Sequence, residues 1–248
     1  MLKNFQNRFH FSPGCRRSFA YVWFAALIGI LSFIPAIPKL IPPHVRLPFS
    51  IHTIIILNIL QSVIVTAVFV AAGSILAPKI GFKAQLVNVP IKNKIFWMIL
   101  KRQFYYGVSM GLAGSIIACL IAPEFITYLN MYPYLSRIFG GLTEEVIMRW
   151  GFLTAIVWIL WRIFQHGIGT PKALLIWTGI LLNQILFSIA HTPALIRFGI
   201  THPIWSVFTI FMVSLPWGWL FWKQGIEAAF IAHVSFHAFV ILFVVMNF

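Results

Sequence analysis

The sequence predicts an all-α fold, a single polytopic membrane bundle of about seven to eight transmembrane helices. Of the 248 residues, 60% are hydrophobic and 9% are charged, whereas charged residues make up roughly a quarter of an ordinary soluble domain. Seven apolar stretches approach or exceed the length of about 20 residues that a helix needs to cross a bilayer. They cover residues 18–38, 50–77, 104–122, 138–161, 173–196, 204–222 and 226–247.

The first stretch follows Arg16 and Arg17, as the apolar core of a secretory signal peptide would. Its apolar run is longer than the roughly 7 to 15 residues of such a core. We therefore expect it to remain as an anchor helix, with a cleaved signal peptide as the alternative.

The distribution of basic residues predicts the orientation, because Lys and Arg are retained on the cytoplasmic side of a membrane. With the N-terminus in the cytoplasm, the far side holds only Lys39, Arg46, Arg137 and Arg197, and Arg149 lies within the membrane. The net charge of +14 is divided into short clusters between apolar runs, which argues against nucleic acid as a partner. We expect a cytoplasmic N-terminus and a prokaryotic plasma membrane, since the short chain shows no soluble domain.

The chain divides into two unequal parts by chemistry. Its longest connection, residues 78–103, is too poor in apolar periodicity to build a soluble core, so one membrane domain is expected. Residues 1–136 are interpreted as membrane-anchoring and scaffold helices. Residues 137–248 carry nearly all of the polar groups that are predicted to lie inside the membrane.

Two of the four acidic residues, Glu144 and Glu145, are adjacent in an apolar run. A charged group at the centre of a bilayer costs at least ~2.5 kcal/mol, so it indicates a functional site. At helical spacing, Glu145 and Arg149 lie on one face in the order that favours an ion pair. Glu144 points about 100° away and needs a proton, a metal or a donor from another helix. Such a carboxylate suits general-base catalysis on water.

The next candidates lie in the fifth stretch, where Gln184, Ser188 and His191 recur at helical spacing. Phe187 lies one turn before His191 and is positioned to pack against its ring. Pro193 marks the end of the regular helix, which would place His191 where water can enter.

The last stretch places His233 and His237 on one helix face, because they are four residues apart. Two histidines at this spacing can bind a metal or hold an oxyanion, and plain packing is the alternative.

Several classes of intramembrane protease are excluded by what the sequence lacks. It contains no aspartate, which excludes the aspartyl class, and no HExxH motif of zinc proteases. The segment Gly107 to Gly111 matches GxSxG, but it lies within an apolar helix and lacks the strand that this motif follows.

Three motifs in order carry a family resemblance: Glu144-Glu145-x-x-x-Arg149, Phe187-x-x-x-His191 and His233-x-x-x-His237. Together they resemble the CPBP family of CAAX-protease and bacteriocin-processing (Abi) intramembrane proteases, over about residues 137–248. The resemblance implies that Glu144 and His191 activate water, with Glu145 and Arg149 in support. It implies that His233 and the residue four positions on hold a metal or form an oxyanion hole.

The final motif departs from the family pattern, which commonly has Asn or Asp where His237 stands. An imidazole there can donate to an oxyanion or bind a metal. A divalent metal such as zinc on His191, His233 and His237 therefore stays open.

The candidate residues are expected at different depths in the membrane. Glu144 and His191 are expected near the non-cytoplasmic ends of their helices, and His233 and His237 nearer the middle, with about 10 Å between the levels of His191 and His237. The prenyl-protein enzymes of the family open to the cytoplasm instead.

The expected function is therefore that of an intramembrane endopeptidase, of the metallo or glutamate type. Its expected substrate is a membrane-associated peptide or a prenylated, CAAX-type protein within the lipid bilayer. Two alternatives remain open. One is a non-catalytic membrane partner or immunity-type protein that keeps the fold, and the other is a proton- or metal-coupled transporter.

Overall fold

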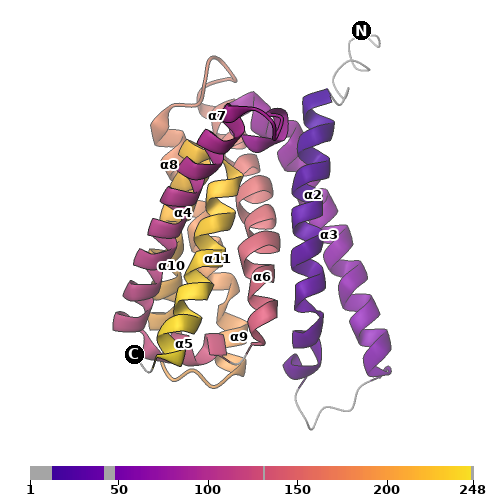
Figure 1. The fold of residues 1–248 in the computed structure, drawn as a ribbon, viewed down its shortest axis with the longest axis vertical. Coiled ribbons are helices and arrows are strands. Elements are labelled where there is room, and N and C mark those ends of the chain that lie inside the picture. The colour runs from indigo at the N-terminus through magenta and orange to yellow at the C-terminus, as the bar shows by residue number, and fades with distance from the viewer. Residues whose placement is uncertain (1–12, 42–47, 131, 247–248) are drawn as a thin grey trace.

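A computed structural model describes residues 13–41, 48–130 and 132–246, and the described residues form helices without any strand (Figure 1). Seven helical segments are long and apolar enough to cross a membrane, which confirms the predicted bundle; the chain is an integral, multi-pass membrane protein. The α-helices are α2 (Pro13–Phe33), α3 (Ile51–Ile80), α4 (Lys94–Ile121), α5 (Pro123–Asn130), α6 (Arg137–Phe139), α7 (Thr154–Phe164), α8 (Ala173–Ala190), α9 (Thr192–Arg197), α10 (Pro203–Gln224) and α11 (Ile226–Val245).

The connection between α3 and α4 is shorter than the predicted residues 78–103, so the predicted bounds are wrong. The helix α3 continues to Ile80 and ends at Gly81, whose φ of 81° is the left-handed conformation that glycine adopts readily. The helix α4 already begins at Lys94, capped by the Asn93 side chain. Long basic side chains such as Lys101 let a helix continue through the membrane surface, because their charged ends can reach water.

The fourth span is one continuous helix over residues 134–164, and its central part is π-helical. The π-helical segments are η4 (Gly140–Glu144) and η5 (Val146–Leu153), on either side of Glu145. Such wide turns are rare and frequently mark functional sites. Contacts from the N-terminal helices hold them: Thr143 Oγ1 donates to the Ala26 carbonyl of α2 at 2.9 Å, and Trp150 Nε1 donates to Ser74 Oγ of α3 at 3.3 Å.

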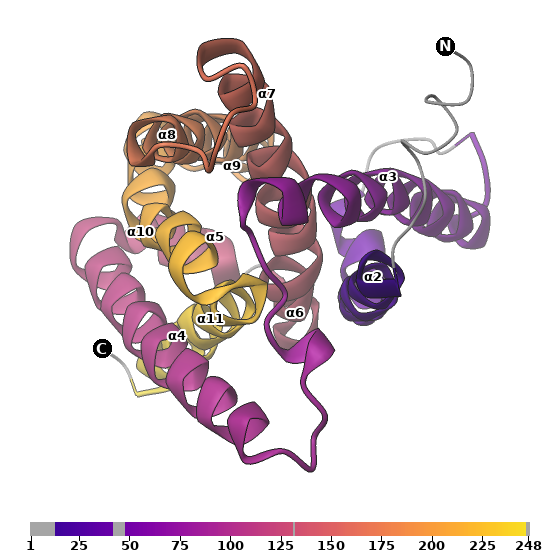
Figure 2. The same cartoon turned by 90° about the horizontal axis from the view of Figure 1, so that it is seen from above.

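The helices α4 and α11 lie in close contact along the bundle (Figure 2). Gly107 and Gly111 of α4 make this approach possible. A Cβ atom at Gly107 would lie 2.7 Å from Ile231 Cβ, and one at Gly111 would lie 2.6 Å from the Ala232 carbonyl oxygen. Small residues four apart are the usual means by which membrane helices approach closely. The GxSxG match is therefore a packing motif in this structure.

The two ends of the bundle differ in charge. The α3–α4 and α7–α8 connections lie at the same end as the start of α2, and this end carries most of the described Lys and Arg residues (Figure 1). The short helices α5 and α9 lie at the opposite end, where Glu124 of α5 accepts a hydrogen bond from the backbone N–H of His202.

Candidate active site

A cavity of about 360 Å³ lies between the helices in the half of the bundle that contains α5 and α9. All four predicted catalytic residues line it: Glu144, His191, His233 and His237. The difference in depth expected between His191 and His237 therefore does not prevent these side chains from sharing one cavity. The fourth span starts several residues earlier than predicted, and α8 gives way at His191 to the short α9, so the chain carries these side chains to one cavity.

Gly140 marks the point where three of these side chains converge. A Cβ atom on Gly140 would lie 3.1 Å from His237 Nε2, 3.2 Å from His233 Nε2 and 3.5 Å from Glu144 Oε2. The π-helical segment that begins at Gly140 thus presents bare backbone to the two imidazoles of α11 and to the carboxylate on its own segment.

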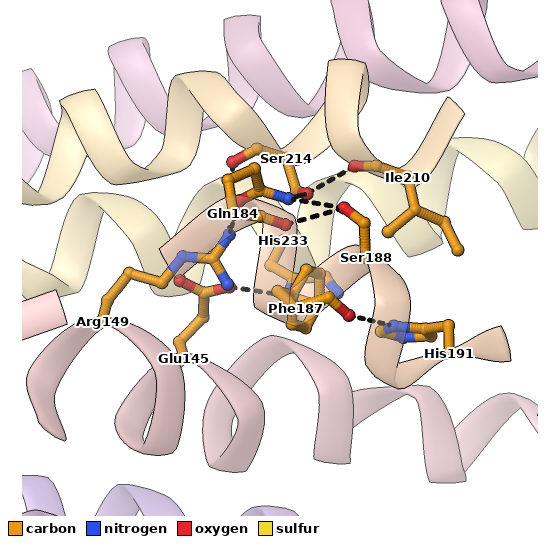
Figure 3. A network of polar contacts seen from close by, with 9 residues as sticks. All are labelled: Glu145, Arg149, Gln184, Phe187, Ser188, His191, Ile210, Ser214 and His233. Carbon is orange, nitrogen blue, oxygen red and sulfur yellow. Dashed lines mark hydrogen bonds and ion pairs between the residues drawn. The ribbon is translucent and has the colours of Figure 1, made fainter. Parts of the chain in front are cut away.

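A buried carboxylate fixes the orientation of His233 (Figure 3). Glu145 Oε1 accepts a hydrogen bond from His233 Nδ1 at 2.8 Å and an ion-pair contact from Arg149 Nη1 at 3.0 Å. The predicted Glu145–Arg149 pair is therefore present, with both side chains 0% exposed. Because Nδ1 faces the carboxylate, His233 presents its Nε2 toward Gly140 and the cavity.

Arg149 is held in turn by polar and aromatic groups of α8 and α10. Its Nη2 donates to Gln184 Oε1 and to the Ser214 carbonyl oxygen, each at 3.2 Å. The guanidinium carbon lies 4.8 Å from the centre of the Phe187 ring and 5.6 Å from that of Trp217. Such contacts compensate part of the free-energy cost of burying a cation.

His191 is oriented by its own helix. Its Nδ1 lies 2.8 Å from the Phe187 carbonyl oxygen, which can only accept, so the proton of the neutral ring is on Nδ1. The Phe187 ring packs edge-on against the imidazole with 4.7 Å between ring centres, as the sequence predicts. His191 Nε2 is consequently left with a free lone pair for a ligand in the cavity. Gln184 and Ser188, the other members of the predicted polar stripe, are buried and bonded to each other.

His237 depends on stacking for its position. Its ring lies 5.0 Å from that of His233 at 24°, and His233 stacks in turn on Trp217 at 4.2 Å. His237 Nδ1 is buried and has no hydrogen-bond partner among the described residues. The protein therefore leaves His237 free to carry its proton on Nε2, from which it can donate into the cavity.

Glu144 differs from Glu145 in its burial and in its hydrogen bonding. It is half-buried, and its carboxylate forms no hydrogen bond or ion pair with any residue of the described ranges. Helical geometry predicted that Glu144 and Glu145 diverge, and the structure places one carboxylate at the cavity and the other in the buried network.

Two tyrosines outside the spans also line the cavity. The hydroxyls of Tyr128 and Tyr132 lie 3.2 Å apart. Burial raises the pKa of Tyr128 far above its ordinary value, and the pKa of Tyr132 is raised by burial as well. A charge on Glu144 adds to both shifts. Both phenols therefore stay neutral and keep a proton to donate.

Arg137 is the cavity residue that the sequence reasoning missed. The distribution of basic residues predicts only its side of the membrane, whereas the structure shows it in α6, within the fourth span and buried against the cavity. Its position was available from spacing, because residue 137 lies seven positions before Glu144, two helical turns on the same face.

The described residues contain no group of three or more His, Cys, Asp or Glu side chains placed to hold a metal ion. His191, His233 and His237 share the cavity, but they do not form a ready three-ligand site in this conformation.

Comparison with known families gives a match to the part of the chain that supplies most of the cavity lining. Residues 128–239 match the family model described as type II CAAX prenyl endopeptidase Rce1-like. No curated protein and no solved structure matches the chain.

Proposed function

Residues 128–239 are an Rce1-like region of the CAAX protease family, and from this premise we propose that the chain is an intramembrane endopeptidase that uses Glu144 and His191 to activate water. One observation carries the proposal. Four groups that can move protons, on three helices distant in sequence, line a single cavity of about 360 Å³. The match covers every one of these residues, and it supports the resemblance that the three motifs indicate.

Water activation follows from the states of the two groups. The carboxylate of Glu144 has no competing hydrogen bond from the described residues, so it is available to take a proton from water. His191 Nε2 has a free lone pair, because Nδ1 is bonded to the Phe187 carbonyl. It can accept the second hydrogen of that water and so direct its oxygen at the substrate carbonyl.

Charge on the carbonyl oxygen develops as water attacks, and His233 and His237 are placed to receive it. The buried carboxylate of Glu145 is bonded to Nδ1 of His233, so a proton on Nε2 of this ring is directed toward the cavity. The same proton can pass to the leaving amine, as in other carboxylate–histidine pairs. His237 supplies a second donor from Nε2, in the place where the family commonly has Asn or Asp.

A divalent metal such as zinc on His191, His233 and His237 defines the other version of the proposal. When bound, such a metal would polarise the carbonyl and acidify water. The proton transfers proposed for Glu144, His191 and His233 do not require this metal. In the described residues, no three His, Cys, Asp or Glu side chains are placed to hold a metal ion. Elemental analysis of the purified protein separates the two: one metal per chain, lost in His233→Ala, supports the metallopeptidase, and its absence supports the glutamate type.

The substrate class follows from the walls of the cavity. Aromatic and aliphatic side chains such as Phe33, Phe125, Leu129 and Phe139 form most of them. They suit a membrane-associated peptide, including a prenylated protein of CAAX type.

The decisive experiment compares Glu144→Gln and His191→Ala with the parent chain in detergent, using a fluorogenic prenylated CAAX-type peptide. We expect turnover to fall about 10²–10⁴-fold in each variant, because each removes a proton-transfer group. The melting temperature of Glu144→Gln should stay unchanged, since no hydrogen bond is lost. Full turnover in both variants would show that the catalytic assignment is wrong, and a cellular phenotype rescued by Glu144→Gln would favour a non-catalytic partner.

Glu145→Gln is the matched control for the same experiment. It changes the adjacent carboxylate in the same way, but it leaves Arg149 without its buried counter-ion. We expect this variant to lose about 3–5 kcal/mol of stability, so that its inactivity coincides with unfolding.

A further inference from the structure

Arg137 is buried beside the cavity with much of its hydrogen-bonding capacity unused. The residue as a whole is 5% exposed. Nη2 donates to Asn130 Oδ1 at 2.9 Å, and the guanidinium carbon lies 5.1 Å from the centre of the Tyr134 ring. Nε and Nη1 are buried and have no hydrogen-bond partner among the described residues.

The charge of Arg137 is also unbalanced. Within the described ranges it forms no ion pair, whereas Arg149 is paired with Glu145. Of the other carboxylates, Glu124 is bonded to Thr201, and Glu227 accepts from Leu86 at the basic end of the bundle. Glu144 lines the same cavity but forms no ion pair with Arg137. An unpaired buried cation costs several kcal/mol, and a catalytic role or a bound anion is a physical reason for a native protein to keep one.

We propose that Arg137 binds a negatively charged oxygen of the peptide in the cavity, an inference that rests on the proposed peptidase function. Guanidinium is the side chain that best matches carboxylate geometry, and it keeps its charge when buried. Two oxygens of a bound peptide have the required chemistry: a substrate carboxylate, and the oxyanion that forms during attack. Both would place the cation of Arg137 in the same cavity as Glu144 and the three histidines.

The first test measures binding without turnover, in chains that carry Glu144→Gln. The probes are a fluorescent prenylated peptide with a free C-terminal carboxylate and the same peptide as its C-terminal amide. If the carboxylate is the ligand, Arg137→Met weakens binding of the acid at least about 30-fold and leaves binding of the amide unchanged.

The second test measures turnover of both peptides in chains that retain Glu144. If the oxyanion is the ligand, Arg137→Met lowers kcat about 10²–10³-fold for acid and amide alike, with little change in KM. Binding and kcat both within twofold of the parent would overturn the proposal.

Two control variants separate anion binding from a structural role. Asn130→Ala removes the hydrogen bond to Nη2 and keeps the charge, and Arg197→Gln removes an exposed cation from α9 at the same end of the bundle. Both should bind and cleave the peptides as the parent does. Equal losses in Asn130→Ala and Arg137→Met would show that Arg137 only holds α5 in place.

Folding and catalysis are followed separately. Thermal unfolding in detergent shows whether Arg137→Met is folded. If it is not, Arg137→Lys tests the anion site instead, because lysine keeps the charge but lacks the guanidinium geometry. A loss of more than tenfold in acid binding or in kcat supports the proposal, and a loss below twofold contradicts it. If Glu144→Gln retains full turnover while Arg137→Met loses acid binding, the catalytic assignment fails and the anion site stands.

Discussion

Gly140 is the residue on which the geometry of the cavity depends most directly. It is buried, and its missing side chain leaves the space where Nε2 of His233, Nε2 of His237 and a Glu144 oxygen approach one another. Its backbone is right-handed helical, with φ of −56°, so an alanine can adopt the same conformation. The glycine is therefore required for space and not for backbone freedom.

Gly140→Ala should consequently separate stability from activity. Alanine stabilises a helix interior by roughly 1 kcal/mol relative to glycine, which offsets the tight contacts of its methyl group. That methyl displaces both imidazoles by a few tenths of an ångström, and we expect turnover to fall about 10- to 100-fold. Thermal unfolding and peptide cleavage in detergent check the two effects.

Gly14→Ala is the matched control, because a Cβ at Gly14 meets no atom within 4 Å. Wild-type turnover in Gly140→Ala would contradict the convergence of the three side chains at this point.

At the scale of elements, the helix pair α4–α11 holds the last motif in place. His233 directly follows Ala232, whose carbonyl oxygen would lie 2.6 Å from a Cβ on Gly111. A larger residue at position 111 must therefore push α11 away from α4, together with His233 and His237.

Gly111→Val is predicted to destabilise the bundle by about 1–3 kcal/mol, the usual free-energy cost of overpacking. Turnover should fall as well, since the displaced α11 carries the two histidines. Ala113→Val provides the control, because Ala113 is on the exposed face of the same helix. Equal melting temperatures for the two variants would show that α4 and α11 are not held by this contact.

The fourth span combines an ion pair that helical spacing predicts with π-helical turns that it does not predict. A regular α-helix suffices to predict the Glu145–Arg149 pair, and that pair forms with an N–O distance of 3.0 Å. The π-helical turns on either side of Glu145 depend on packing against α2 and α3, through Thr143 and Trp150. Those contacts join residues far apart in the chain, so no local pattern in the sequence predicts them.

At the scale of the whole molecule, the cavity and the basic residues lie toward opposite ends. Phe125 and Tyr128 of α5 and Ala194 of α9 line the cavity, whereas the connections rich in Lys and Arg lie at the other end. Basic loops favour the cytoplasm. A cytoplasmic N-terminus thus predicts a cavity in the non-cytoplasmic half of the bilayer.

This sidedness can be measured with single cysteines in a background that lacks Cys15 and Cys119. A membrane-impermeant maleimide added to intact cells should label Thr127→Cys on α5 and leave Thr170→Cys in the α7–α8 connection unlabelled until the membrane is permeabilised. Both positions are exposed, so accessibility within the protein does not bias the result. The reverse labelling would place the cavity on the cytoplasmic side, where the prenyl-protein enzymes of the family open.

The sequence by itself determined the bundle of spanning helices, the family resemblance and the residues of the candidate site. Apolar length reports the spans because the bilayer has a fixed thickness, and Glu or His in such spans is rare enough to indicate function. The structure confirms the seven spans and brings Glu144, His191, His233 and His237 to one cavity. The Rce1-like match at residues 128–239 confirms the resemblance.

Only the tertiary structure decided which groups touch and which remain unpaired. Glu145 bonds to His233 across 88 positions of sequence, and Gly140 lies against imidazoles of α11. Arg137, which the sequence placed only on the far side of the membrane, is buried at the cavity without an ion-pair partner among the described residues. Such facts depend on how helices rotate and pack against one another. Periodicity gives the face of each helix but not the partner that this face meets.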